Sequence, residues 1–191
     1  MKKHFFLSTI LTILVSGVSF AQNNPQPILV AEIGGGGRVK TTSLPRIDKG
    51  SPQVSRDENY SLEKQTFEIL NAERRTRGLD PLVWDERVAQ LARLHSRSMA
   101  AEKFFSHRGP DGSTVDGRAD QLGLSTWTAI AENIAFLKGQ NDPAQLAVNK
   151  WLSSPPHRKN ILGGGWEGSA IGVAVGQDGA FYFTQVFISG V

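Results

Sequence analysis

Cysteine is absent from this chain of 191 residues. No disulfide can therefore cross-link the fold, and its stability has to come from a packed core. A chain of this length can bury one sizeable core, and its composition argues against two.

The N-terminus carries the features of an export signal. Lys2 and Lys3 precede an apolar run over residues 5–20, and Ala21 completes a small-residue cleavage site. We predict a signal peptide over residues 1–21 and a secreted protein, extracellular or periplasmic, with no transmembrane span after cleavage. The apolar run is close to the minimum length for a membrane span, so an uncleaved anchor is the alternative interpretation.

A large excess of charge of either sign is also absent. Loss of residues 1–21 removes two of the 21 basic residues and none of the 18 acidic ones, which leaves a formal charge of about +1. Nucleic-acid binding requires a concentrated basic face. The charge balance therefore argues against a nucleic-acid partner.

Residues 22–58 have the composition of a flexible or disordered linker. Four prolines and the tract Gly34–Gly37 interrupt this segment, and no apolar period persists through it. The short stretch Ile28–Ile33 is apolar and is the one place where a strand or a binding segment is conceivable. We favour a tether, because too little apolar surface is present to offset the entropy of ordering.

Residues 59–191 predict one α+β domain. Helices are predicted from an N-cap at Ser61 to Gly78, from an N-cap at Asp85 through Met99, from Pro143 to Leu152, and from an N-cap at Ser154 to Leu162. Strands are predicted over residues 169–175 and 180–188, joined by a hairpin turn at residues 177–179. Residues 104–117 are predicted as a loop. Helices around a small antiparallel sheet favour a three-layer α-β-α sandwich.

Three histidines and one glutamate are the candidates for chemistry. His95 lies on the apolar face of the second predicted helix, which is typical of a hydrogen-bonded core histidine. His107 lies in a loop, and His157 opens a short helix behind two prolines. Glu132 lies in an apolar stretch, where a carboxylate is costly unless it is paired. Glu132 either holds a loop through backbone N–H groups, or it orients an imidazole or helps to hold a cation.

Seven short motifs occur in the order found in bacterial CAP (SCP) domains, whose superfamily includes cysteine-rich secretory proteins, antigen 5 and plant pathogenesis-related proteins. The motifs are NAER (71–74), LVWD (82–85), LARLHSRSM (91–99), FSH (105–107), AENIA (131–135), WLSSPPHRKNIL (151–162) and IGVA (171–174). The chain resembles this superfamily over roughly residues 62–188. The resemblance implies the same α-β-α sandwich.

The resemblance also implies a central cleft with two histidines and two glutamates. His107 and His157 match the two histidines, and Glu132 matches the first glutamate. The second glutamate is expected near residues 151–154, where this chain has serines and no acid. The three matching residues are candidate ligands of Zn²⁺ or another divalent metal, with water as the fourth ligand. No other cofactor is implied.

Two classes of function follow. The first is a secreted, monomeric binding module that uses its His/Glu-lined cleft or an apolar groove for a lipid, a glycan, a cell-wall component or a protein. The alternative is a metal-dependent hydrolase, with water activated at His107 and His157 and with Glu132 as base. A nucleophilic Ser154 is a weaker idea, because Ser154 is explained as a helix cap. A structural envelope protein is the last possibility. We favour the binding module because one acid is missing.

Overall fold

The computed structural model describes residues 56–139 and 141–190. The predicted signal peptide, the linker up to residue 55 and the Ile28–Ile33 segment lie outside the described residues. The described part contains five helices and three strands, in the order α1 (Arg56–Thr76), α2 (Glu86–Glu102), α3 (Val115–Gln121), β1 (Ala129–Leu137), α4 (Pro143–Ser153), α5 (Pro155–Leu162), β2 (Gly168–Val175) and β3 (Phe181–Ser189).

The three strands form one antiparallel sheet in the order β1-β3-β2. Strands β2 and β3 form the predicted hairpin, and its turn is closed by a hydrogen bond from Gly176 N to Ala180 O. Gly179 adopts a positive φ of 75° in this turn, a conformation that glycine reaches without steric cost. Strand β1 pairs with β3 along its whole length and leaves its other edge without a strand neighbour among the described residues.

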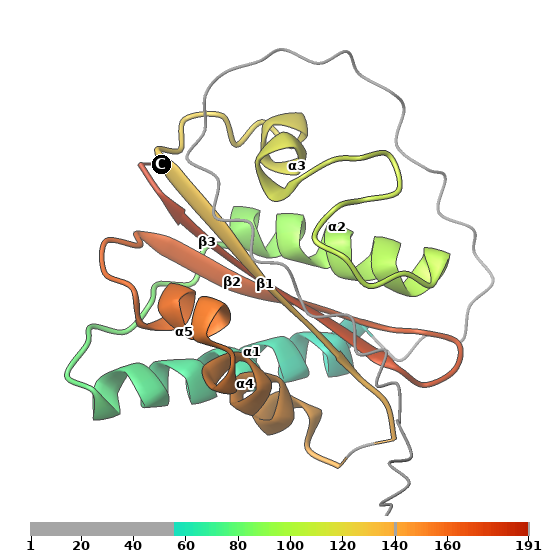
Figure 1. Cartoon of the computed structure of the whole chain (residues 1–191), viewed down its shortest axis with the longest axis horizontal. Helices are drawn as coiled ribbons and strands as arrows, with labels where there is room; N and C mark the ends of the chain where they lie inside the picture. Colours follow the sequence, from blue (N-terminus) through green and yellow to red (C-terminus); the bar gives the residue numbers. More distant parts are fainter. Residues whose placement is uncertain (1–55, 140, 191) are drawn as a thin grey trace, which may run out of the picture.

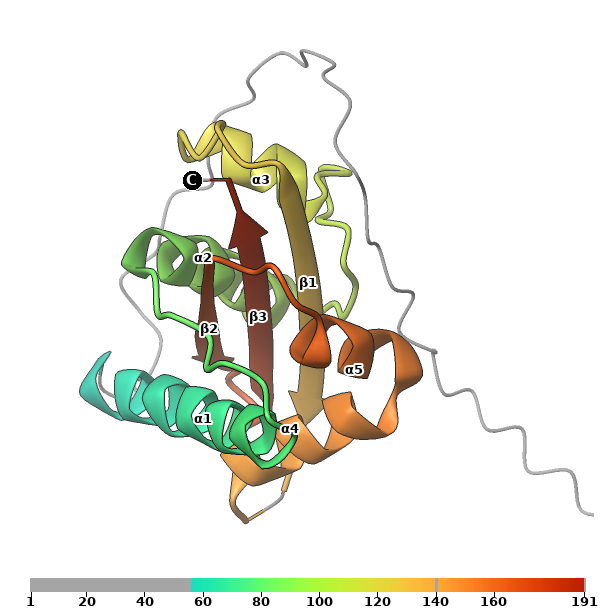
Figure 2. The same ribbon diagram turned by 90° about the vertical axis from the view of Figure 1, so that its left-hand side faces the viewer.

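Helices cover both faces of the sheet (Figures 1 and 2). Helices α2 and α3 lie on one face, and helices α1, α4 and α5 lie on the other. Side chains alternate along β1: Ile130 packs with Val88 and Leu91 of α2, whereas Ala131 packs in the core that contains Trp151 of α4. The structure therefore confirms the predicted α+β, three-layer α-β-α sandwich.

Helix α2 lies in close contact with strand β2. A Cβ atom added at Gly172 would fall 2.2 Å from the backbone nitrogen of Arg93. Ser96 in α2 also donates a hydrogen bond to Gly172 O at 2.9 Å. The missing side chain at Gly172 thus lets the helix backbone approach the sheet and fixes the position of His95, one residue before Ser96.

Several predicted boundaries are confirmed. Asp85 is the N-cap of α2, and its carboxylate accepts a hydrogen bond from Arg87 N at 2.8 Å. Helices α4 and α5 and strands β2 and β3 lie within one residue of their predicted ends. Ser154 occupies the N-cap position of α5, but its side chain forms no capping hydrogen bond. The predicted capping role of the Ser154 hydroxyl is therefore wrong.

Three features differ from the prediction. Helix α1 begins at Arg56, so Ser61 lies inside the helix and is not its N-cap. The first turns of α1 contain mostly polar residues, which give no apolar period to mark its start. Helix α3 begins at Val115, inside the predicted loop, and is too short to show a period. Strand β1 falls where the sequence predicts no element, because it is buried on both faces and lacks alternation.

Candidate functional site

The three predicted site residues come together at the open edge of the sheet. His107 lies in the loop before α3, Glu132 lies in β1, and His157 lies in the first turn of α5. The imidazole centroids of His107 and His157 are 6.2 Å apart. Helices α2 and α3 flank the loop of His107 on one face of the sheet and α5 carries His157 on the other, so the two rings meet beside the edge strand β1 (Figures 1 and 2). All three residues are buried.

Both oxygens of the Glu132 carboxylate are engaged. Oε1 lies 2.8 Å from His107 Nδ1, and Oε2 accepts a hydrogen bond of 2.6 Å from Arg118 Nη2. Burial raises the pKa of Glu132, but the charge of Arg118 and the contacts with the histidines lower that pKa to about 2. Glu132 is therefore ionised at neutral pH, and its charge is balanced by a buried guanidinium.

The ionised carboxylate fixes the tautomer of His107. A carboxylate can only accept hydrogen bonds, so Nδ1 of His107 must carry the proton. In the neutral ring, Nε2 of His107 then carries a free lone pair. This atom is buried and has no hydrogen-bond partner among the described residues. The pair Glu132–His107 thus presents an imidazole nitrogen that is able to accept a hydrogen bond or bind a cation.

His157 offers a second nitrogen without a partner among the described residues, its buried Nε2. Burial, and then the neighbouring His107, lower the pKa of His157 to about 4, so its ring is neutral at pH 7. Asn133 donates a hydrogen bond to the backbone oxygen of His157 at 3.2 Å and accepts one from Asn160 at 2.9 Å. These amides attach α5 to β1 and hold His157 in place.

His95 is a buried core histidine, as its helix position predicts. Its Nε2 lies 2.9 Å from the backbone oxygen of Ser106, so Nε2 donates to that carbonyl. The same nitrogen is 3.8 Å from Glu132 Oε1. Burial lowers the pKa of His95 to about 4. His95 therefore supports the loop that carries His107 and borders the site, a proximity that the sequence did not reveal.

The sequence analysis missed Arg118, the positively charged partner of Glu132 in the site. Arg118 lies in α3, is buried, and donates hydrogen bonds to the backbone oxygens of His107 and Ser113 besides its ion pair with Glu132. The region near residues 151–154 contributes no side chain to this cluster: Ser153 donates to Asn149 O. No motif marks Arg118, because a buried arginine in a seven-residue helix carries no periodic signal.

The donor set can be tested against a divalent metal. No three His, Asp or Glu side chains within residues 56–139 and 141–190 are arranged to hold one ion. The two unpartnered Nε2 atoms of His107 and His157 are suitable ligands, and Glu132 bonds to the far nitrogen of His107. A carboxylate behind a ligand histidine is a common arrangement at metal sites. The described residues therefore offer two imidazole donors, with Glu132 behind one of them, and no third side-chain ligand.

Comparison with known proteins identifies the family. The family model of the cysteine-rich secretory protein family (CAP) matches residues 67–187. The chain therefore belongs to the CAP family, as its motifs and its fold indicate. It is 39% identical over 126 residues to YkwD, an uncharacterized protein of Bacillus subtilis, in a match that covers 66% of this chain and 46% of YkwD.

Solved structures agree with this assignment. An extracellular protein of Bacillus anthracis that contains an SCP domain is 30% identical, with a TM-score of 0.60 over 73% of this chain and 45% of that one. An outer surface protein of Borrelia burgdorferi is 17% identical, with a TM-score of 0.62 over 74% and 100% of the two chains, and shares the fold.

The matched Bacillus proteins are longer than the segment that they share with this chain. The chain spans less than half the length of YkwD and of the Bacillus anthracis protein. Activities of those longer proteins are therefore not transferred to it. In the part of the chain that the structure describes, no helix has both the length and the apolarity needed to cross a membrane.

Proposed function

We propose that this chain is an exported, monomeric CAP-domain binding module that holds a component of the cell envelope without cleaving it. The predicted signal peptide and the similarity to an extracellular SCP-domain protein support export. The buried cluster of His107, Glu132 and His157 supports a role at the open edge of the sheet, where two imidazole nitrogens lack partners among the described residues.

The state of Glu132 carries the choice of binding over hydrolysis. In the alternative function, a metal-dependent hydrolase, Glu132 would act as the general base. A general base works best with a pKa near the operating pH and needs a free oxygen within reach of the water. The pKa of Glu132 is lowered to about 2, and both of its oxygens are engaged by His107 and Arg118. Glu132 is thus suited to positioning His107 and unsuited to removing a proton.

Binding and turnover can be measured in one experiment. The chain without residues 1–21 is incubated with purified cell walls and, separately, with lipid vesicles. The bound fraction is measured by sedimentation and the released products by mass spectrometry. We expect saturable binding to the cell walls and no product beyond the buffer control. Products that accumulate over many turnovers, and that disappear in Glu132→Gln, would show that the chain is a hydrolase.

The unpartnered nitrogens favour metal binding as a second candidate property. His107 and His157 would hold the ion through Nε2, and the ion would supply open coordination positions for a ligand oxygen. Calorimetric titration should then detect saturable Zn²⁺ binding at pH 7 that weakens as the pH falls through the histidine range. Glu132→Gln should weaken binding roughly ten- to a hundredfold. His95→Gln is the matched control and should retain binding; no saturable binding to the wild type would refute this candidate.

A further inference from the structure

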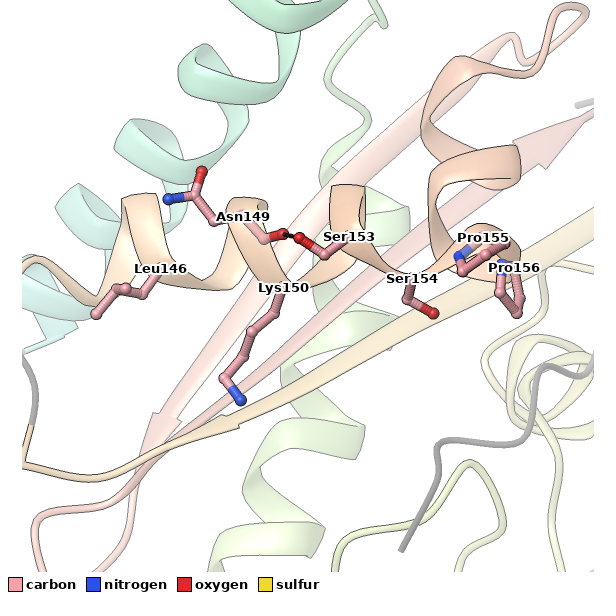
Figure 3. Close-up of a pocket in the computed structure, with 7 residues that line it drawn as sticks. All are labelled: Leu146, Asn149, Lys150, Ser153, Ser154, Pro155 and Pro156. Carbon is pink, nitrogen blue, oxygen red and sulfur yellow. Dashed lines mark hydrogen bonds between the residues drawn. The ribbon is translucent and has the colours of Figure 1, made fainter. Parts of the chain in front are cut away.

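A groove lies at the corner between α4 and α5, outside the histidine cluster (Figure 3). Its volume is about 510 Å³, within the range of small-molecule sites. Its lining combines aliphatic surface with hydroxyl, amide and ammonium groups: Leu146, Asn149, Lys150, Ser153, Ser154, Pro155 and Pro156. The ammonium of Lys150 and the hydroxyl of Ser154 extend on the same side of the ribbon. The groove therefore offers flat apolar surface and polar groups side by side.

Positive charge flanks this groove, and negative charge is absent from its elements. Helices α4 and α5 contain three basic residues and no Asp or Glu, whereas Asp142 caps α4 one turn before Leu146. Lys150 lines the groove, and Lys159 lies one helical turn beyond Pro155 and Pro156, on the same face of α5. No ion pair found within residues 56–139 and 141–190 involves either lysine. Both ammonium groups are available to an anionic ligand, which this local charge favours.

The shape and composition of the groove favour a sugar polymer over a peptide. Peptides bind by adding a strand to a sheet edge, by placing several apolar anchors in a hydrophobic groove or, when they are acidic, by pairing with clusters of arginine, which this lining lacks. The lining is helical and offers one large apolar side chain, Leu146. Proline rings give rigid surfaces for the C–H faces of pyranose rings, while the hydroxyl of Ser154 can bond to hydroxyl or acetamido groups (Figure 3). Anionic groups on such a sugar would pair with the two lysines.

We infer that the α4–α5 groove binds a glycan strand of N-acetylated amino sugars that carries carboxylates, with Lys150 and Lys159 as the charge partners of those carboxylates. The inference rests on the proposed binding function and names its ligand class. Pro156 lines the groove and directly precedes His157 in α5. An occupant of the groove would therefore lie against the same helix that holds His157 in the buried cluster.

Two matched tetrasaccharides test the role of the carboxylates. One alternates N-acetylglucosamine with N-acetylmuramic acid, which carries a lactyl carboxylate, and the other is neutral chitotetraose. Calorimetry with the chain lacking residues 1–21 should show at least about tenfold tighter binding of the acidic sugar. Lys150→Gln/Lys159→Gln should abolish this difference in affinity between the two sugars. Lys64→Gln/Arg87→Gln removes two charges from α1 and α2, outside the groove lining, and should preserve the difference in affinity.

A second readout locates the site. Backbone amide shifts in NMR spectra should change most at Asn149, Lys150, Ser153 and Ser154 when the acidic tetrasaccharide is added. The inference would be overturned by equal affinity for the two sugars, or by an unchanged difference in affinity in Lys150→Gln/Lys159→Gln. It would also be overturned if the largest amide shift changes fell outside the groove. Equal binding of a tetraglutamate peptide would also overturn it, because charge alone would then suffice. If such a result accompanies saturable binding to whole cell walls, the proposed function stands and only the groove assignment fails.

Discussion

Acidification from pH 7 to pH 5 should destabilise this fold because two neutral histidines are buried in it. The pKa values of His95 and His157 are both lowered to about 4, mainly by burial, from an ordinary value of 6.5. Below pH 6.5 the unfolded chain binds protons at these positions, whereas the folded chain does not bind them until about pH 4. These two histidines therefore leave the free energy of unfolding nearly undiminished above pH 6.5 and reduce it as the pH falls from 6.5 toward 4.

The size of this loss follows from the two pKa values. At pH 5, a histidine pKa that is lowered from 6.5 to about 4 reduces the free energy of unfolding by about 2 kcal/mol for each residue. At pH 7 the same pKa shift reduces it by only about a few tenths of a kcal/mol. The two residues together should lower the free energy of unfolding by roughly 3–4 kcal/mol between pH 7 and pH 5. Small domains are stable by only about 5–15 kcal/mol, so this loss is readily measurable.

Urea unfolding followed by tryptophan fluorescence measures the effect. The experiment is carried out at several pH values from 7 to 5 in the presence of EDTA, which removes any bound metal. His95→Gln/His157→Gln cannot take up these protons, so its midpoint should change much less with pH, although its stability at pH 7 is lower. A wild-type midpoint that is constant from pH 7 to pH 5, or a double variant with an unchanged slope, would refute the reasoning.

Two further substitutions test the ion pair and the helix–sheet contact. Arg118→Met leaves the Glu132 carboxylate buried without its cation and should cost about 3–5 kcal/mol in urea unfolding. The double variant Arg118→Met/Glu132→Gln should recover much of this stability. A cost below about 1 kcal/mol for the single variant would contradict the ion pair. Gly172→Ala places a Cβ against the α2 backbone and should cost about 3 kcal/mol or more. Gly117→Ala in α3 meets no atom within 4 Å and should be neutral or slightly stabilising; equal effects at the two glycines would refute the close contact.

Local signals made much of this fold predictable from the sequence. Asp85 precedes a regular apolar stripe, and Pro143 opens another, so helices α2 and α4 were predicted close to their observed positions. Strand β1 lies between helix layers on both faces, and its nearly continuous burial removes the alternation that identifies a strand. Helix α3 has seven residues, too few for a period. These two elements supply Glu132 and Arg118, so the centre of the site lay where the sequence was least informative.

The candidate site was predicted in part. His107, Glu132 and His157 were selected by motif and by the cost of burying a carboxylate, and the structure brings them together. The sequence could not show that Arg118 occupies the second oxygen of Glu132, because that contact joins a loop-flanked helix to a strand 14 residues away. This single ion pair bears on the chemistry of the site, since it keeps the Glu132 carboxylate ionised beside a fixed positive charge.

The proton position on His107 tests the central claim that Glu132 positions an imidazole and does not act as a base. In the neutral form of His107, long-range ¹H–¹⁵N NMR spectra of the metal-free chain should show the proton on Nδ1. In Glu132→Gln this strong preference should be lost, because a neutral amide replaces the acceptor-only carboxylate. A wild-type His107 with its proton on Nε2, or with the same tautomer balance as in Glu132→Gln, would contradict the account.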